Sequence, residues 1–111
     1  MKALRIDVDG KMQAVEITGN SISEQNDCIY EMIGCEIWES VRLGTDAVML
    51  VDEEGLLKAL PFNGMASMIA DRHLVGTVLI VGVMGTYDGD VFCDCPERFL
   101  KFARDVRALL Q

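Results

Sequence analysis

The apolar stretch from Leu74 to Met84, LVGTVLIVGVM, decides the fold of this chain. Its valines, leucine and isoleucine would fill both faces of an extended strand. With Gly85 it runs for about twelve residues, whereas a membrane-spanning helix needs about twenty. We therefore expect the central strand of a sheet. A strand buried on both faces needs cover on both, from helices or from a partner chain.

A β-hairpin is predicted at the amino-terminal end. Lys2 to Asp9 alternates apolar and polar residues, which is the pattern of a half-buried strand. Asp9-Gly10 is a signal for a type I′ turn, and Met12 to Thr18 continues in extended form.

A helix is expected next, because apolar residues recur at helical spacing between a possible cap at each end. Ser23 is the expected N-cap, and Gly34 stands where a left-handed C′ glycine belongs. The apolar face carries Cys28, Ile29, Met32 and Ile33.

Cys35 to Leu43 alternates again and predicts a strand. One face is apolar, and the other carries Trp38, Ser40 and Arg42. This second face has three interpretations: solvent, a second core, or a subunit interface.

The chain between this strand and the central one is predicted to be largely extended. Ala47 to Val51 is an apolar strand, Asp52 to Gly55 is a tight connection, and Pro61 ends the extended segment that follows. Asn63 is the expected N-cap of a short helix that carries Met65, Met68 and Ile69.

The clearest helix start lies near the carboxyl end, after a loop at Thr86–Asp90. Asp94 is the expected N-cap, with Pro96 in the first turn and Glu97 at the capping-box position. The apolar stripe that follows predicts burial of Phe99, Phe102, Val106 and Leu109.

These elements define an α+β fold. We expect a mixed, mainly antiparallel sheet of five to seven strands, a C-terminal amphipathic helix, and one or two shorter helices, in a single domain over residues 1–111.

Composition narrows the function classes. The chain has 18 acidic and 10 basic residues, a net charge of −8, so nucleic acid and anionic membranes are not expected partners. No signal peptide is visible, and four cysteines without one indicate free thiols in the cytoplasm. Their spacing does not match zinc motifs, and no phosphate-binding glycine motif predicts a cofactor.

Few residues could carry catalysis. His73 is the only histidine, and its sequence context fits a surface position better than a catalytic one. Asp52, Glu53 and Glu54 are more typical of a solvated turn than of a cation site. Asn63 is either a helix cap or a ligand contact at a helix N-terminus.

The segment from Leu50 through Asp52-Glu53-Glu54-Gly55 to Leu60-Pro61-Phe62-Asn63, followed by Ala66, resembles a family of short phage and mobile-element proteins catalogued as domain of unknown function 3846. Val75 to Gly82 and the Asp88-Gly89-Asp90 turn fit the same pattern, so the resemblance covers about residues 46–90. It implies a phage or mobile-element origin and brings no established activity.

We therefore expect a non-enzymatic binding protein, for example a counter-defence factor in the host cytoplasm. It would sequester a small anionic or nucleotide ligand or mask a host protein. The enzymatic alternative is a small hydrolase or nucleotide-processing enzyme that uses His73 and the acidic turn. A third class is a regulatory protein whose acidic surface engages a host DNA-binding protein.

A homodimer or higher homo-oligomer is also expected, because the chain offers few helices to cover the sheet and Trp38 lies off the main apolar face. A ligand pocket would then lie near that interface. The candidate lining residues are Trp38, Arg42, Phe62, Asn63, Arg72 and His73.

Overall fold

The predicted central strand is present as β5, Val78–Thr86, in the computed structural model, which describes residues 1–110. It begins four residues later than the sequence suggested. Gly76 has a positive φ of 77°, and before it Val75 forms an isolated bridge with Phe62. The six residues Val78–Val83 are buried, as expected for a strand covered on both faces.

The sheet has six strands in the order β2-β1-β5-β4-β3, and β6 pairs with the second half of β5. Every pairing is antiparallel. The other strands are β1 (Lys2–Ile6), β2 (Met12–Glu16), β3 (Trp38–Arg42), β4 (Ala47–Asp52) and β6 (Gly89–Cys93). The α+β prediction is therefore confirmed.

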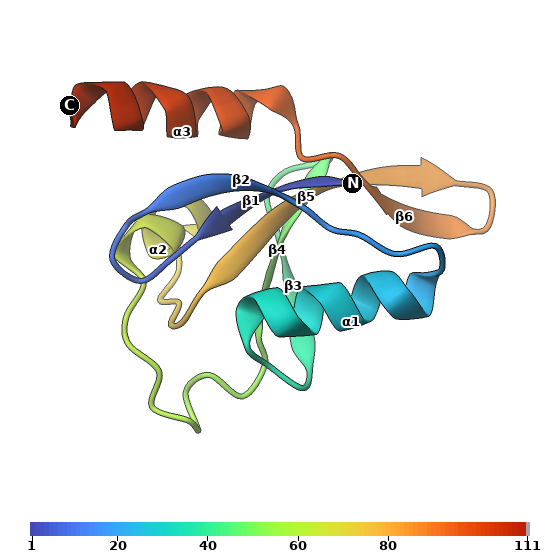
Figure 1. The fold of residues 1–111 in the computed structure, drawn as a ribbon, viewed down its shortest axis with the longest axis horizontal. Coiled ribbons are helices and arrows are strands. Elements are labelled where there is room, and N and C mark those ends of the chain that lie inside the picture. Colours follow the sequence, from blue (N-terminus) through green and yellow to red (C-terminus); the bar gives the residue numbers. More distant parts are fainter. Residues whose placement is uncertain (111) are drawn as a thin grey trace.

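Three helices cover the two faces of the sheet: α1 (Ile22–Ile33), α2 (Gly64–Ala70) and α3 (Glu97–Leu109). In Figure 1, α1 lies on one side of the sheet and α3 on the other, with α2 beside the β1–β2 hairpin. Two separate apolar cores result. One packs Ile29 and Ile33 of α1 against Leu50 and Leu79, and the other packs α2 and α3 against the opposite face.

Two predicted helix caps are wrong. Ser21, not Ser23, caps α1, because its Oγ accepts from the Glu24 amide at 3.1 Å. Asp94 does not cap α3, because its carboxylate accepts from the Lys2 amide at 2.8 Å instead. The C-terminal glycine of α1 is confirmed, since Gly34 is left-handed and donates to the Tyr30 carbonyl.

Three other boundaries differ. The strand predicted at Cys35–Leu43 shortens to β3, and the segment after Gly55 folds into turns that expose Leu56 and Leu57. The predicted loop at Thr86–Asp90 is the tight end of the β5–β6 hairpin.

The burial predicted for α3 is only partly correct. Leu100 and Ala103 are its buried residues, Phe99, Phe102 and Val106 are half-buried, and Leu109 is 84% exposed. The helix reaches past the sheet, so its last turn has nothing to pack on (Figure 1). None of the helices within residues 1–110 combines the length and apolar character that crossing a bilayer requires.

Candidate binding groove

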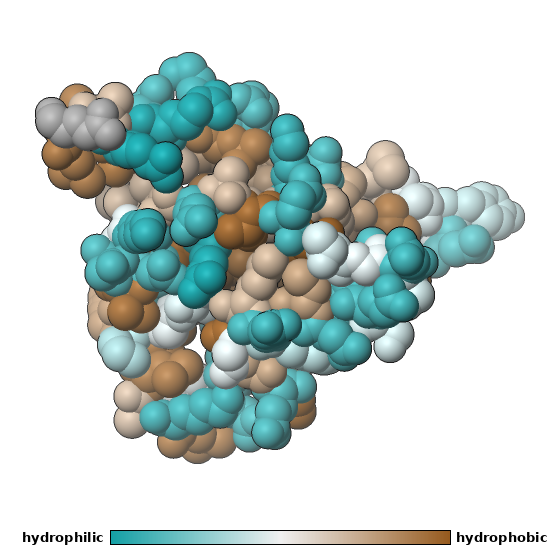
Figure 2. Space-filling model, viewed as in Figure 1, coloured by the Kyte–Doolittle hydropathy of each residue, from teal (hydrophilic) through white to brown (hydrophobic). Residues whose placement is uncertain are grey.

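A groove of about 820 Å³ lies between the β1–β2 turn, the start of α2 and the second half of α3. Figure 2 shows brown hydrophobic surface between α3 and the body of the molecule. Apolar and charged side chains share the lining, which consists of Asp9, Gly10, Lys11, Met12, Gln13, Met65, Ala103, Val106, Arg107 and Leu110. A second groove of about 420 Å³ continues along β2 and shares Met12, Ala103 and Arg107 with the first.

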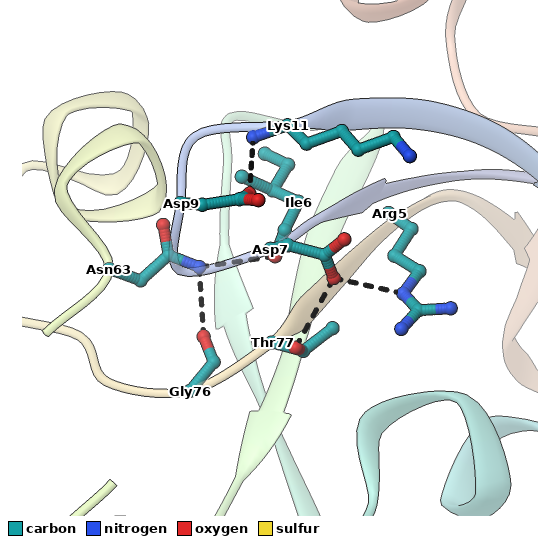
Figure 3. Close-up of polar contacts among 8 residues, drawn as sticks. All are labelled: Arg5, Ile6, Asp7, Asp9, Lys11, Asn63, Gly76 and Thr77. Atoms are coloured by element: carbon teal, nitrogen blue, oxygen red, sulfur yellow. Dashed lines mark hydrogen bonds and ion pairs between the residues drawn. The ribbon is translucent and has the colours of Figure 1, made fainter. Parts of the chain in front are cut away.

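The β1–β2 turn forms one wall of the groove. The Gly10 amide donates to the Asp7 carbonyl at 3.0 Å, and the Asp7 amide donates to the Lys11 carbonyl at 2.9 Å. Gly10 has a φ of 89°. This is a type I turn followed by a left-handed glycine, a three-residue hairpin loop rather than the predicted two-residue type I′ turn. The Asp9 carboxylate braces it by accepting from the Lys11 amide (Figure 3).

Asn63 ties α2 to this hairpin. Its side chain is fully buried, and its amide donates to the carbonyls of Ile6 at 3.1 Å and Gly76 at 2.8 Å (Figure 3). Its Oδ1 accepts from the Ala66 amide at 3.0 Å and so begins α2. Of the two interpretations of Asn63, the helix cap is correct. The side chain positions the groove without reaching it.

A second polar contact holds the same end of β1. The Asp7 carboxylate accepts from Arg5 Nε at 3.1 Å and from the Thr77 hydroxyl at 3.3 Å (Figure 3). The hairpin wall is therefore fixed to the chain entering β5 by side chains from three segments.

The opposite wall is α3, whose first turn is fixed at two points. Arg98 makes two bonds to Asp46 in the β3–β4 turn, at 2.6 and 2.7 Å, and this guanidinium holds the pKa of the Asp46 carboxyl below its ordinary value. At Gly82 the chain leading into α3 crosses β5 so closely that a Cβ would lie 2.3 Å from the Asp94 carbonyl oxygen. Any side chain at Gly82 would therefore clash with the segment that leads into α3.

The far half of α3 is held by Arg107, whose Nη2 donates to the Met12 carbonyl at 3.0 Å. Among residues 1–110, no carboxylate lies within ion-pair distance of Arg107 or Lys11. By contrast, Arg104 pairs with Glu97, and Lys101 pairs with Asp105. The groove therefore gathers two unneutralised cations beside one carboxylate, Asp9, in a chain whose net charge is −8.

None of the six residues predicted to line a pocket lies in this groove. Phe62 and His73 pack edge to face with ring centroids 4.9 Å apart, and both are exposed, as is Arg72. Asn63 is buried beside them. Phe62, Arg72 and His73 lie at the surface around the two ends of α2, and Asn63 begins that helix from the interior.

Trp38 and Arg42 lie together elsewhere, on β3. The Trp38 ring lies 5.6 Å from that of Phe92, and Arg42 approaches Asp90 at 3.7 Å. Of the three interpretations of this face, the structure supports a second core for Trp38, because the ring packs against the core beneath α1, and the subunit interface stays a prediction.

The acidic turn has a structural use. The Asp52 side chain is 1% exposed, and its two oxygens accept from the Glu54 amide at 2.9 Å and from Lys58 Nζ at 2.8 Å. Both oxygens are therefore engaged in closing the turn after β4.

The four cysteines lie apart from the groove. Cys35 and Cys95 are buried, Cys28 and Cys93 are half-buried, and burial raises the pKa of the Cys95 thiol to about 12. Within the described residues, no three metal-binding side chains of the His, Cys, Asp or Glu type gather in one place.

Sequence reasoning missed the groove because its walls are about 95 residues apart in the chain, as the contact from Arg107 to Met12 shows. Two signals were available: a turn with flanking charges at Asp9-Gly10-Lys11, and a basic residue at Arg107 beside the apolar stripe. Neither one indicates that the two segments meet.

Comparison with known proteins gives one match. The family model described as Domain of unknown function (DUF3846) matches residues 1–107. No curated protein and no solved structure matches the chain.

Proposed function

Because the chain belongs to the DUF3846 family, which brings no known function, we propose a function from the groove itself. The protein is a non-enzymatic binding protein that sequesters a small organic anion in the groove beneath α3. The ligand combines an apolar body with a phosphate or carboxylate, a class that includes nucleotides.

The observation that carries this proposal is the pairing of an apolar floor with two unneutralised cations. Met12, Met65 and Val106 offer apolar contact, while Lys11 and Arg107 stand at the same opening. Methionine side chains adapt to ligands of varied shape. Charge–charge attraction is strong enough at a partly desolvated site to select an anion over a neutral analogue.

The size of the groove agrees with a small ligand. Pockets that hold small molecules measure roughly 300–1,000 Å³, and this one measures about 820 Å³. Arg107 is already held by the Met12 carbonyl, so the guanidinium loses little conformational freedom when a ligand binds.

The biological setting is part of the proposal. Motifs resembling those of phage and mobile-element proteins support an origin in such an element, with action in the host cytoplasm as a counter-defence factor that removes a signalling nucleotide. The identity of the neighbouring genes tests this setting independently of ligand binding.

The direct test is a thermal-shift screen against linear and cyclic nucleotides, acyl phosphates and medium-chain carboxylates, with neutral analogues as the reference. A ligand at about 100 times its Kd stabilises the folded state by about 2.7 kcal/mol. We expect at least one anion to raise Tm while its neutral analogue does not.

Variants locate the site. Arg107→Gln and Lys11→Gln should each weaken binding at least tenfold, and Lys11→Gln leaves the Arg107 contact to Met12 intact. Lys101→Gln is the matched control, because Lys101 lies on the exposed side of α3 and pairs with Asp105. Equal binding by all three variants, or no shift from any anion, would overturn the proposal in favour of masking a host protein.

A further inference from the structure

Two of the edge strands of the sheet, β2 and β3, differ in how their free backbone groups are used. In the β1–β2 ladder the odd-numbered residues of β2 face β1, as the bonds from Asp7 to Lys11 and from Ile17 to Met1 show. The even-numbered residues Met12, Ala14 and Glu16 therefore point their N–H and C=O groups outward. At this edge Arg107 of α3 donates a hydrogen bond to the Met12 carbonyl.

The ladder hydrogen bonds likewise show which backbone groups of β3 point outward. The Leu43 amide donates to the Ala47 carbonyl, and the Glu53 amide donates to the Ile37 carbonyl. Odd-numbered residues of β3 thus face β4, so Trp38, Ser40 and Arg42 direct their N–H and C=O groups away from the sheet. No other segment of residues 1–110 accepts a hydrogen bond from these three amides. A free edge of this kind is a template for another strand.

We propose that two copies of this chain pair through β3, antiparallel and centred on Ser40, to form one continuous sheet across a twofold axis. In this register the outward groups of Trp38 meet those of Arg42 in the partner copy, and Ser40 meets its own counterpart. Three such pairs supply the two-bond rings of an antiparallel ladder.

The side chains favour this register on both faces. Ile37, which is 50% exposed, lies opposite Leu43 of the second copy, and the Ser40 hydroxyls lie opposite each other. Arg42 lies opposite the Trp38 ring, an arrangement that allows cation–π contact. Its side chain is 53% exposed and makes two long contacts, to Asp90 at 3.7 Å and to the Thr45 carbonyl at 3.4 Å, which it would exchange for the ring.

Neighbouring registers are poorer. A shift by two residues toward the start of β3 places Glu39 directly opposite Glu39 of the second copy, which is repulsive. A shift by two toward its end places Trp38 opposite Gly44, which lies beyond β3, and leaves the ring without an arginine. Because the same strand serves both copies, the interface is a closed twofold one.

Light scattering after gel filtration at micromolar concentrations tests this inference on the full chain. We expect twice the monomer mass. Ser40→Pro removes the central outward N–H, and proline is tolerated at an edge strand when its nitrogen faces outward. Ser40→Lys places two like charges opposite each other at the twofold axis. Both variants should keep the far-UV circular dichroism of the parent and have the monomer mass.

Ala14→Pro is the matched control, since Ala14 is exposed and its N–H points outward at the opposite edge. It should remain dimeric. Amide exchange at Trp38, Ser40 and Arg42 should slow as protein concentration rises. A monomeric parent, or a dimer that survives both Ser40 variants, would overturn the inference. Neither outcome bears on the groove beneath α3, which β3 does not line.

Discussion

The two faces of the sheet are closed by different means. Beneath α1, Ile29 is 1% exposed and packs with Ile17, Leu50 and Leu79, so apolar burial holds the helix down. On the other face, α3 also buries two of its own residues, Leu100 and Ala103, but polar contacts from Arg98 and Arg107 add to its docking. The groove therefore lies where a helix rests on the sheet without filling the space beneath it.

The largest expected effect concerns the face of the sheet that α1 covers, called the closed face below. Ile29→Ala should lower the free energy of unfolding by about 2–5 kcal/mol, because it removes a fully buried side chain and leaves a cavity. Urea unfolding followed by circular dichroism measures this. Ile22→Ala on the same helix is the control, since Ile22 is 79% exposed and should cost less than about 0.5 kcal/mol. Similar losses for the two variants would contradict the packing of α1.

The second-largest loss of stability is expected for Asn63, on the face that α2 and α3 cover, called the open face below. Asn63→Ala removes three buried hydrogen bonds, to the Ile6 and Gly76 carbonyls and from the Ala66 amide, at an expected cost of about 2–4 kcal/mol. Ser21→Ala removes an exposed helix cap only and should cost about 1 kcal/mol. If the two losses prove equal in urea unfolding, Asn63 acts as a helix cap alone and does not hold the hairpin.

Acid should loosen the open face before the closed one. Arg98 lowers the pKa of Asp46 below its ordinary value, and Arg104 likewise lowers the pKa of Glu97. A carboxyl whose pKa is depressed in the folded state contributes stability above its unfolded pKa, and that contribution is lost as pH falls through the folded value. Both groups are exposed, so the effect is small.

The measurement is amide exchange in α1 and α3 between pH 5 and pH 2. Protection of α3 should fall first, and Asp46→Asn should weaken it already at pH 5. Simultaneous loss in both helices would mean that the Arg98–Asp46 contact does not hold α3 separately.

The smallest effect is expected at the free end of α3. Leu109→Ser should change the free energy of unfolding by no more than about 0.5 kcal/mol, because Leu109 is 84% exposed. Leu100→Ala in the same helix should cost about 2–5 kcal/mol, since Leu100 is buried. A large loss for Leu109→Ser would show that a partner covers the last turn.

Local signals in the sequence predicted much of the fold. The run of valines around Ile80, the glycine at the end of α1 and the alternation in β1 each depend on neighbouring residues only, and each was identified correctly. The missed boundaries had competing local signals. Asp94 resembles an N-cap in the sequence, but its carboxylate instead accepts a hydrogen bond from the amide of Lys2, at the other end of the chain.

Local signals did not predict the candidate site. Phe62, Asn63, Arg72 and His73 are close in sequence and lie around the two ends of α2, yet none of them lines the grooves beneath α3. Asn63 was correctly recognised as a cap, because capping involves residues three apart. Its bond to Ile6 spans 57 residues and has no sequence pattern.

Local sequence patterns thus predicted most of the strands and helices, their apolar faces, and the need for cover on both sides of the sheet. These properties follow from periodicity and from contacts within a few residues. Only the tertiary structure decided that Arg107 meets Met12, that α3 leaves a groove beside the Asp9-Gly10 turn, and that the edge of β3 stays open. Such features depend on the packing of segments distant in the chain, and packing geometry has no period in the sequence.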